Sequence, residues 1–351
     1  KIGCGAYAEV YKVQHKTDKQ FYAAKVIDIK QLSLKDKQGQ VMEVLCLQQL
    51  KHPNIVSLKD VYCQINQYAS SANPTSITNL VLVLELAEST LVNKIALCQK
   101  LRIRLSEKQI MLIMTQLLFG LLAIHRSNII HRDIKSENIL LSGEREQVKI
   151  ADFGVSVRGQ SSKDVGTPMF KAPEFYTGEL YDNLVDVWAA GVILFQLIEL
   201  ESPFVGTDMQ IECSVRKFTN AKVRASQPMQ DLLDVMLCAQ KKRLSVAKIL
   251  ELPYVKAQIA DLYTEEQLGE MAGLQRSLAK VLVNSVSLVD LAPKSNYSTK
   301  SECLKIQNVE QIHQSINNES RKSQKCIESE KSSEYPQSEG QILKQEKIVL
   351  Q

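Results

Sequence analysis

The chain has 351 residues, of which 44% are hydrophobic and 23% charged, and this excludes a short peptide, a single disulfide knot and wholesale disorder. Its 43 basic and 39 acidic residues leave a formal net charge of +4. A charge this small indicates neither a nucleic acid nor an anionic membrane as the main partner. At about 150 residues per domain, we expect two to three compact units.

The cysteines and the apolar stretches indicate in which cellular compartment the protein is expected. Eight cysteines show neither Cys-x-x-Cys pairs nor the regular spacing of a disulfide or zinc framework, so we expect reduced thiols and a cytoplasmic protein, with the nucleus as the alternative. The stretches Ile110–Ile124 and Leu184–Leu200 are too short or too interrupted by polar residues to cross a bilayer, and we expect buried helices and no membrane span. Because the first residue is Lys1, the chain is expected to begin inside a domain.

The first 86 residues read as a β-rich lobe. Two β-favouring runs, Glu9–Gln14 and Phe21–Ile29, predict strands of a hairpin. Ser33 then marks the start of a helix that stops at the proline in Lys51–Asn54. A strand pair follows, and we interpret its polar interruption, Gln64–Asn79, as a surface loop.

Helical patterns dominate after a short connector, residues 87–91. Ser106 and Gln109 form a capping-box pattern, and the apolar helix that follows is expected to end near Asn128, a residue that tolerates a left-handed exit. We place the helical lobe at residues 92–256. A helical extension over 257–291 could dock or remain mobile, and residues 292–351 are polar enough to predict a disordered tail that is either regulatory or only solvated.

The residues that carry chemistry are polar groups between apolar flanks. The hairpin Gly3–Val10 has glycines that let backbone amides approach phosphate oxygens, and Lys25, on a strand between alanines and aliphatics, needs a partner that Glu43 could supply. The segments Ile129–Leu141 and Lys149–Gly154 bring carboxylates and an amide into apolar surroundings, where stability alone does not explain them. Hard oxygen ligands of this kind suit magnesium.

These motifs resemble, in order and context, the catalytic domain of eukaryotic protein kinases over residues 1–256. The motifs are the glycine hairpin, Lys25, Glu43, His131-Arg132-Asp133 with Asn138, Asp152-Phe153-Gly154 and Ala172-Pro173-Glu174. The resemblance implies an α+β, bilobal fold with a small β-rich lobe and a larger helical lobe. It also implies ATP and Mg²⁺ as cofactors and transfer of the γ-phosphoryl group to hydroxyls of protein substrates.

The resemblance assigns roles residue by residue. Lys25, held by Glu43, would engage the α- and β-phosphates, and Asn138 and Asp152 would hold Mg²⁺. Asp133 would orient the substrate hydroxyl, and Lys135 would offset the developing charge. The residues implied in ATP binding are Ile2, Gly3, Gly5, Val10, Ala23, Lys25, Leu84, Glu85, Ala87 and Leu140.

Further features favour serine/threonine substrates and a regulated loop. Lys135, two residues after Asp133, and the sequence Gly166–Pro168 resemble the serine/threonine branch, and Thr167 and Glu174 are implied in the substrate platform. Arg132 beside Asp133 indicates activation by a loop phosphate, added by an upstream kinase, for which Ser161 and Ser162 are the candidates. The alternative is that both are solvated loop serines.

The sequence departs from the family pattern at two places. Ala8 replaces the third glycine of the hairpin, and the usual Asp-Pro is missing before Arg243, whose pairing with Glu174 we still expect. A pseudokinase that acts as a scaffold or allosteric binder is the main alternative function, and a small-molecule kinase of related fold is the second. The presence of Lys25, Asp133, Asn138 and Asp152 argues against the first, and the segment Gly166–Glu174 against the second.

Overall fold

The computed structural model describes most of the first 267 residues. The chain divides into two compact units, Lys1–Val309 and Glu310–Gln351, and every described residue belongs to the first. Most of the predicted helical extension and of the predicted polar tail lies outside the described residues. These are residues 1–267 except 6–7, 31, 66–76, 144–145, 219–221 and 265, together with 304–305.

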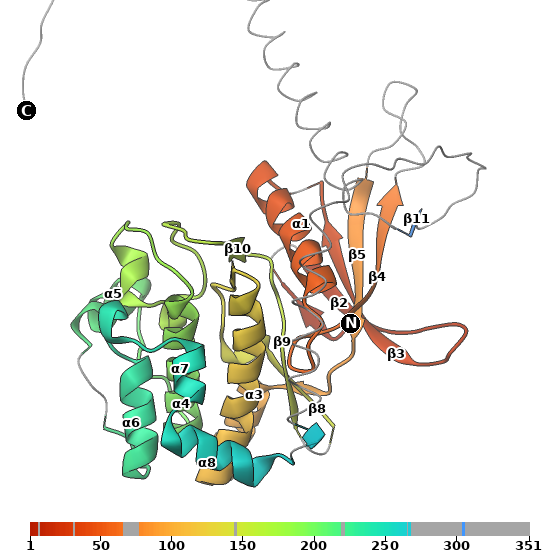
Figure 1. Ribbon diagram of the computed structural model, residues 1–351. Coiled ribbons are helices and arrows are strands. Elements are labelled where there is room, and N and C mark those ends of the chain that lie inside the picture. Colours follow the sequence, from red (N-terminus) through yellow and green to blue (C-terminus); the bar gives the residue numbers. More distant parts are fainter. Residues whose placement is uncertain are drawn as a thin grey trace, which may run out of the picture. The chain divides into compact units, whose positions relative to one another are not determined.

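The N-terminal part is an antiparallel sheet with one helix, α1 (Leu34–Gln49), as Figure 1 shows in red and orange. The sheet order is β1-β2-β3-β5-β4-β11, and every neighbouring pair is antiparallel. A β-rich region followed by a helical one confirms the predicted α+β class. The strands are β1 (Gly3–Cys4), β2 (Ala8–Gln14), β3 (Phe21–Asp28), β4 (Leu58–Ile65), β5 (Ile77–Glu85) and β11 (Leu304–Lys305).

Local signals account for these elements. The predicted hairpin is confirmed as β2 and β3, and the Ser33 hydroxyl caps α1 by accepting a hydrogen bond from the Asp36 amide. The predicted loop at 64–79 was too long at both ends. The Asn79 amide group donates to Gln64 Oε1 at 2.7 Å and the Thr78 hydroxyl donates to the Gln64 carbonyl at 3.1 Å, so polar pairs extend the β4–β5 ladder beyond its apolar stretch.

The C-terminal part is mainly helical. Two small sheets accompany the helices, β6-β8-β9 and β7-β10, formed by β6 (Ser89–Thr90), β7 (Ile129–Ile130), β8 (Ile139–Ser142), β9 (Gln147–Ile150) and β10 (Val157–Arg158). Short 3₁₀ turns lie at Ser136–Asn138, Pro168–Phe170, Pro173–Tyr176 and Gln240–Lys242. The helices are α2 (Leu91–Leu101), α3 (Glu107–Arg126), α4 (Leu184–Glu199), α5 (Asp208–Lys217), α6 (Gln227–Met236), α7 (Val246–Leu250) and α8 (Pro253–Leu262).

Helix α3 forms the centre of this helical part. The predicted capping box of Ser106 and Gln109 is confirmed, and Asn128 after its end has a φ of 56°. By length and composition α3 is the one helix in the described part that could cross a membrane, but 72% of its most apolar window is buried inside the protein. A mostly buried helix is weak evidence for a span, because core helices pass the same test.

The segment between α1 and β4 joins the sheet to the helical part. The Val56 amide donates to the Ile150 carbonyl and the Ile150 amide to the Asn54 carbonyl, both at 2.9 Å. The Lys149 ammonium, also in β9, pairs with Glu85 at 2.9 Å. The end of β9, two residues before Asp152, is therefore bonded to the segment that precedes β4 and to the end of β5.

A buried ion pair closes the helical part, and it confirms the predicted pairing of Arg243 with Glu174. The Arg243 guanidinium contacts Glu174 at 2.5 and 3.2 Å and also donates to the carbonyls of Leu184 and Cys238. The side chain of Arg243 is fully buried. Its charge is therefore satisfied by a carboxylate and two backbone groups without the missing Asp-Pro.

Replacing Arg243 with Met should lower the free energy of unfolding by about 3–5 kcal/mol, because Glu174 stays buried without its partner. Urea denaturation of the full chain measures this. The control is Lys108→Met, which breaks a pair with Asp261 in which both side chains are exposed, and it should cost much less. Equal losses for the two variants would contradict the structural role of Arg243.

Candidate functional site

A charged group joins the sheet, α1 and the segment after β9. The Lys25 ammonium on β3 lies 2.7 and 2.8 Å from the two carboxylate oxygens of Glu43 on α1, and 3.0 Å from Asp152 Oδ1. The side chains of Lys25 and Glu43 are 15% and 1% exposed. The sequence-predicted pairing of these two residues is therefore confirmed, and Asp152 is its third member.

Burial and charge oppose each other in this group. Burial disfavours the ammonium of Lys25, but the carboxylates of Glu43 and Asp152 outweigh it and raise the pKa of Lys25 above its ordinary value. The Asp152 side chain is 46% exposed, so burial disfavours its carboxylate less, and Lys25, with smaller effects of His131 and Lys135, holds the pKa of Asp152 below its ordinary value. Both groups are charged at neutral pH.

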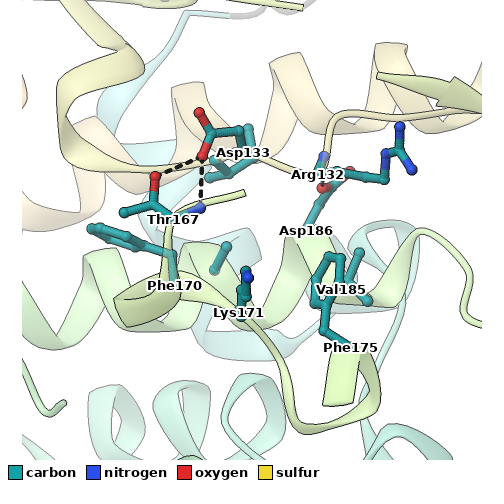
Figure 2. Close-up of a pocket in the computed structure, with 10 residues that line it drawn as sticks. Arg132, Asp133, Thr167, Phe170, Lys171, Phe175, Val185 and Asp186 are labelled. Atoms are coloured by element: carbon teal, nitrogen blue, oxygen red, sulfur yellow. Dashed lines mark hydrogen bonds between the residues drawn. The ribbon is translucent and has the colours of Figure 1, made fainter. Parts of the chain in front are cut away.

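A second group surrounds Asp133 on the loop after β7. Asp133 Oδ1 accepts hydrogen bonds from the Thr167 amide at 3.1 Å and the Thr167 hydroxyl at 2.9 Å, which Figure 2 shows as dashed lines. Asp133 Oδ2 accepts from the Asn138 amide group at 3.1 Å and pairs with the Lys135 ammonium at 2.7 Å. Lys135 also donates to the Thr167 hydroxyl at 2.9 Å. The structure thus brings together four of the predicted site residues.

A buried carboxylate in α4 holds this loop in place. Asp186 is 1% exposed, and its oxygens accept the backbone amides of His131 and Arg132, both at 2.9 Å, and contact the His125 ring at 2.9 Å. Burial works against the charge of Asp186, but the hydrogen bond of His125 and the neighbouring charges lower its pKa. The sequence prediction gave Asp186 no role in the site. An isolated acidic residue in an apolar helix was the available signal.

Gly166 allows Thr167 to reach Asp133. Its φ is +91°, and a Cβ at this position would lie 2.4 Å from the carbonyl oxygen of Arg132. Only glycine fits both conditions, because the conformation is left-handed and the neighbouring atom is backbone. The loop that carries Thr167 therefore lies directly on the loop that carries Asp133.

The two groups are connected through Asn138. The Ala151 amide donates to the Asn138 carbonyl at 2.9 Å, so the residue before Asp152 is bonded to the Asp133 loop. The Asn138 side chain donates to both the backbone and the side chain of Asp133. Within the described part of the chain, Asn138 Oδ1 and Asp152 Oδ2 accept no hydrogen bond, and these two hard oxygens could take part in holding a divalent cation.

A cavity of about 480 Å³ opens beside these groups. It lies between the hairpin, α1 and the segment after β9, and its lining includes Gly5, Lys25, Gly39, Asp152 and Gly154 but neither Asn138 nor the residues of the connector. Among the described residues no cluster of three or more His, Cys, Asp or Glu side chains could hold a metal alone. A cation here would need further oxygen ligands from phosphate or water, which is the usual coordination of Mg²⁺.

The other residues predicted to bind a nucleotide lie on the sheet, the connector and β8. Ala23 is the cross-strand partner of Leu84, and Gly3 that of Val10, while Ile2 is exposed and donates its amide to Val10. The Glu85 amide is used within the fold, donating to Ser57, but the backbone N–H and C=O of Ala87 make no bond among the described residues. Leu140 lies on β8 opposite Thr90.

The two candidate phosphorylation sites differ in the structure. Ser161 is buried, forms a backbone bridge with Tyr181, and accepts a hydrogen bond from Arg132 Nη1 at 3.0 Å. Ser162 is exposed. Arg132 also donates to the Val155 carbonyl at 2.6 Å, so it is bonded to neutral oxygens and to no carboxylate in the part of the chain that the structure describes.

Comparison with known proteins decides the family. A family model described as protein kinase domain matches residues 1–255. The chain belongs to the protein kinase domain family. Glu174, implied in the substrate platform, is in this kinase domain the buried partner of Arg243.

Curated relatives are serine/threonine-protein kinases. The chain is 28% identical to human Nek5 over 278 residues, 77% of this chain and 37% of that protein. It is 31% identical to human Nek2 over 294 residues, 80% of this chain and 63% of that protein. It is 37% identical to pakG of Dictyostelium discoideum over 208 residues, 58% of this chain and 16% of that protein. The chain thus spans less than two thirds of the length of these relatives.

Replacing Lys25 with Met should raise the pKa of Asp152, because burial and the Glu43 carboxylate then act on it without the neighbouring ammonium. A ¹³C NMR titration of the Asp152 carboxyl carbon in the full chain measures this. Lys30→Met, at an exposed lysine near the end of the same strand, is the control and should leave the pKa as it is. An unchanged pKa in Lys25→Met would contradict the assignment of Lys25 as the charge that keeps Asp152 ionised.

Proposed function

We propose that this chain is a serine/threonine protein kinase that transfers the γ-phosphoryl group of Mg-ATP to hydroxyls of protein substrates. The observation that carries the proposal is the position of Lys25, 2.7 Å from Glu43 and 3.0 Å from Asp152, whose segment is joined to the Asp133 loop through the hydrogen bonds of Asn138. Phosphoryl transfer depends mostly on positioning and charge, and the site offers both. A pseudokinase would not need all of these groups.

The nucleotide would lie between the sheet and β8. The Lys25 ammonium, kept charged by its partners, binds the α- and β-phosphates, and Gly3 and Gly5 leave room for the phosphates on the side of the hairpin because they carry no Cβ. The free backbone N–H and C=O of Ala87 fit the hydrogen-bonding edge of adenine beside Glu85. The apolar walls are formed by Ile2, Val10, Ala23, Leu84 and Leu140.

Magnesium would be held by Asp152 and Asn138, whose free oxygens suit it. When bound, the ion neutralises phosphate charge. Asp152 can keep its bond to Lys25 through Oδ1 and use Oδ2 for the metal. Asn138, which donates to Asp133 through its amide nitrogen, keeps its oxygen for the same purpose.

Asp133 would orient the substrate hydroxyl. Its carboxylate already accepts hydrogen bonds from Thr167 and Asn138 and pairs with Lys135, so its position is fixed before substrate binds. The Lys135 ammonium, with three donors, can turn from Asp133 Oδ2 to the transferred phosphoryl group, which frees that oxygen for the hydroxyl proton. The relatives named as serine/threonine-protein kinases, and the resemblance of Lys135 and Gly166–Pro168 to that branch, support serine and threonine rather than tyrosine as acceptors.

The partners are protein substrates and, for activation, an upstream kinase. We infer a cytoplasmic location, with the nucleus as the alternative. The support is that Cys4, Cys46, Cys63, Cys98, Cys213 and Cys238 are free thiols, as expected in a reducing compartment.

Incubation with γ-labelled ATP, Mg²⁺ and a generic basic protein tests the activity. Wild type should transfer label to serine and threonine, Asp133→Asn should lower kcat by about 10²- to 10⁴-fold, and Asp152→Asn should lose transfer. Asp208→Asn, at an exposed carboxylate of α5, is the matched control and should retain activity. Activity equal in Asp152→Asn and wild type would defeat the metal assignment, and inactive wild type with bound ATP would favour the pseudokinase.

The loop phosphate is expected on Ser162. This serine is exposed, whereas Ser161 is buried and already bonded to Arg132. Mass-spectrometric peptide mapping after phosphorylation should find phosphate on Ser162, and Ser162→Ala should remove it while Ser161→Ala retains it. Phosphate on Ser161 alone, or on neither serine in fully active protein, would refute this assignment.

A further inference from the structure

Helix α1 has a glycine in its interior. Gly39 lies between Leu34 and Gln49, the ends of the helix, and both of its neighbours in sequence are glutamines. Glycine in a helix interior costs about 0.5–1 kcal/mol relative to alanine. The φ of Gly39 is not positive, so backbone conformation does not require glycine here. Its presence needs a reason outside the helix.

The reason is a direct backbone contact with the segment that contains Asp152. A Cβ on Gly39 would lie 2.5 Å from the carbonyl oxygen of Gly154, far inside the 3.4 Å at which ordinary contact begins. The obstacle is a backbone atom and not the end of a flexible side chain. The helix can therefore lie this close only because residue 39 has no side chain.

This contact lies one helical turn from the charged group. Gly39 and Glu43 are four residues apart and so share a face of α1. Glu43 holds Lys25, and Lys25 holds Asp152, two residues before Gly154. One face of α1 thus contacts the segment Asp152–Gly154 at two points. One contact runs from Glu43 through Lys25 to Asp152, and the other joins Gly39 to Gly154.

The positions of both contacts are coupled. A Cβ on Gly154 would lie 3.7 Å from Glu43 Oε2, so the Glu43 carboxylate is next to the glycine that Gly39 contacts. A methyl group on residue 39 would have to move helix and segment apart, because its Cβ would lie 2.5 Å from the Gly154 carbonyl oxygen and real Cβ atoms essentially never come within 3.0 Å of such an atom. Because Glu43 lies on the same face of α1, that movement shifts its carboxylate relative to Lys25 and weakens the hydrogen bonds of 2.7 and 2.8 Å between them.

We propose that Gly39 is a positioning residue for phosphoryl transfer. Its missing side chain sets the distance between α1 and the segment Asp152–Gly154, and this distance lets Glu43 reach Lys25. The part of the inference that concerns catalysis rests on the proposed kinase activity. The part that concerns geometry does not, and the experiment separates them.

The test compares Gly39→Ala with Gln38→Ala in the full chain. Both variants are assayed well below their Tm, because weakening the buried ion pair lowers the stability of Gly39→Ala even though alanine favours a helix. Under these conditions the kcat of Gly39→Ala should fall at least about 10-fold. Gln38 is exposed, so Gln38→Ala should keep wild-type kcat. Hydrogen exchange should become faster in α1 and around Gly154 of Gly39→Ala, but not in α3. Wild-type kcat in fully folded Gly39→Ala would overturn the proposal.

A double-mutant cycle with Glu43→Gln shows whether Gly39 acts through the ion pair. If it does, Gly39→Ala should reduce kcat by less in the Glu43→Gln background than in wild type. Fully additive losses would overturn the proposal. If wild type transfers no phosphate, the proposed function fails, and the exchange comparison alone decides: unchanged exchange at α1 and Gly154 then overturns the inference.

Discussion

The site depends on one interaction, the burial of the Lys25 ammonium between two carboxylates. Moving charges out of water is expensive, and the cost is offset only when geometry and partners are right. Lys25 comes from the sheet, Glu43 from α1 and Asp152 from the segment after β9, so the charges can be satisfied together only when all three elements are docked. The position of α1 thereby decides whether the nucleotide site is complete.

A second buried charge, the Asp186 carboxylate, positions catalytic residues in the helical part. Asp186 fixes the backbone of His131 and Arg132 from inside α4, which leaves Asp133 with a defined direction before any substrate arrives. Arg132 has a φ of 68° and Asp152 one of 65°, conformations that cost energy in residues other than glycine. Such strain persists because hydrogen bonds on both sides over-determine it, and both residues belong to the site.

Much of the site could be predicted from the sequence because its polar residues interrupt apolar runs. Lys25 between alanines, and Asp133 and Asn138 between aliphatics, can be recognised from the sequence alone. Contacts between the backbones of distant residues cannot be recognised in this way. In the sequence Gly39 is only a residue that weakens a helix, and Ser161 is no different from the serine beside it. What distinguishes these positions is a backbone contact with a partner far along the chain, at Gly154 or Tyr181, which local patterning does not contain.

The loop after Asp152 is held along its length by close backbone contacts at glycines and by a hydrogen bond of one small side chain. Near its start, the Gly154 carbonyl lies against Gly39, and near its end Gly166 lies against the Arg132 carbonyl. Between them, the Ser161 hydroxyl accepts a hydrogen bond from the Arg132 guanidinium. Because these contacts are made without an added charge, a phosphate on this loop would strengthen an arrangement that already exists. Substitutions at the close backbone contacts of Gly39 and Gly166 should therefore disturb the site more than loss of the Arg132 side chain.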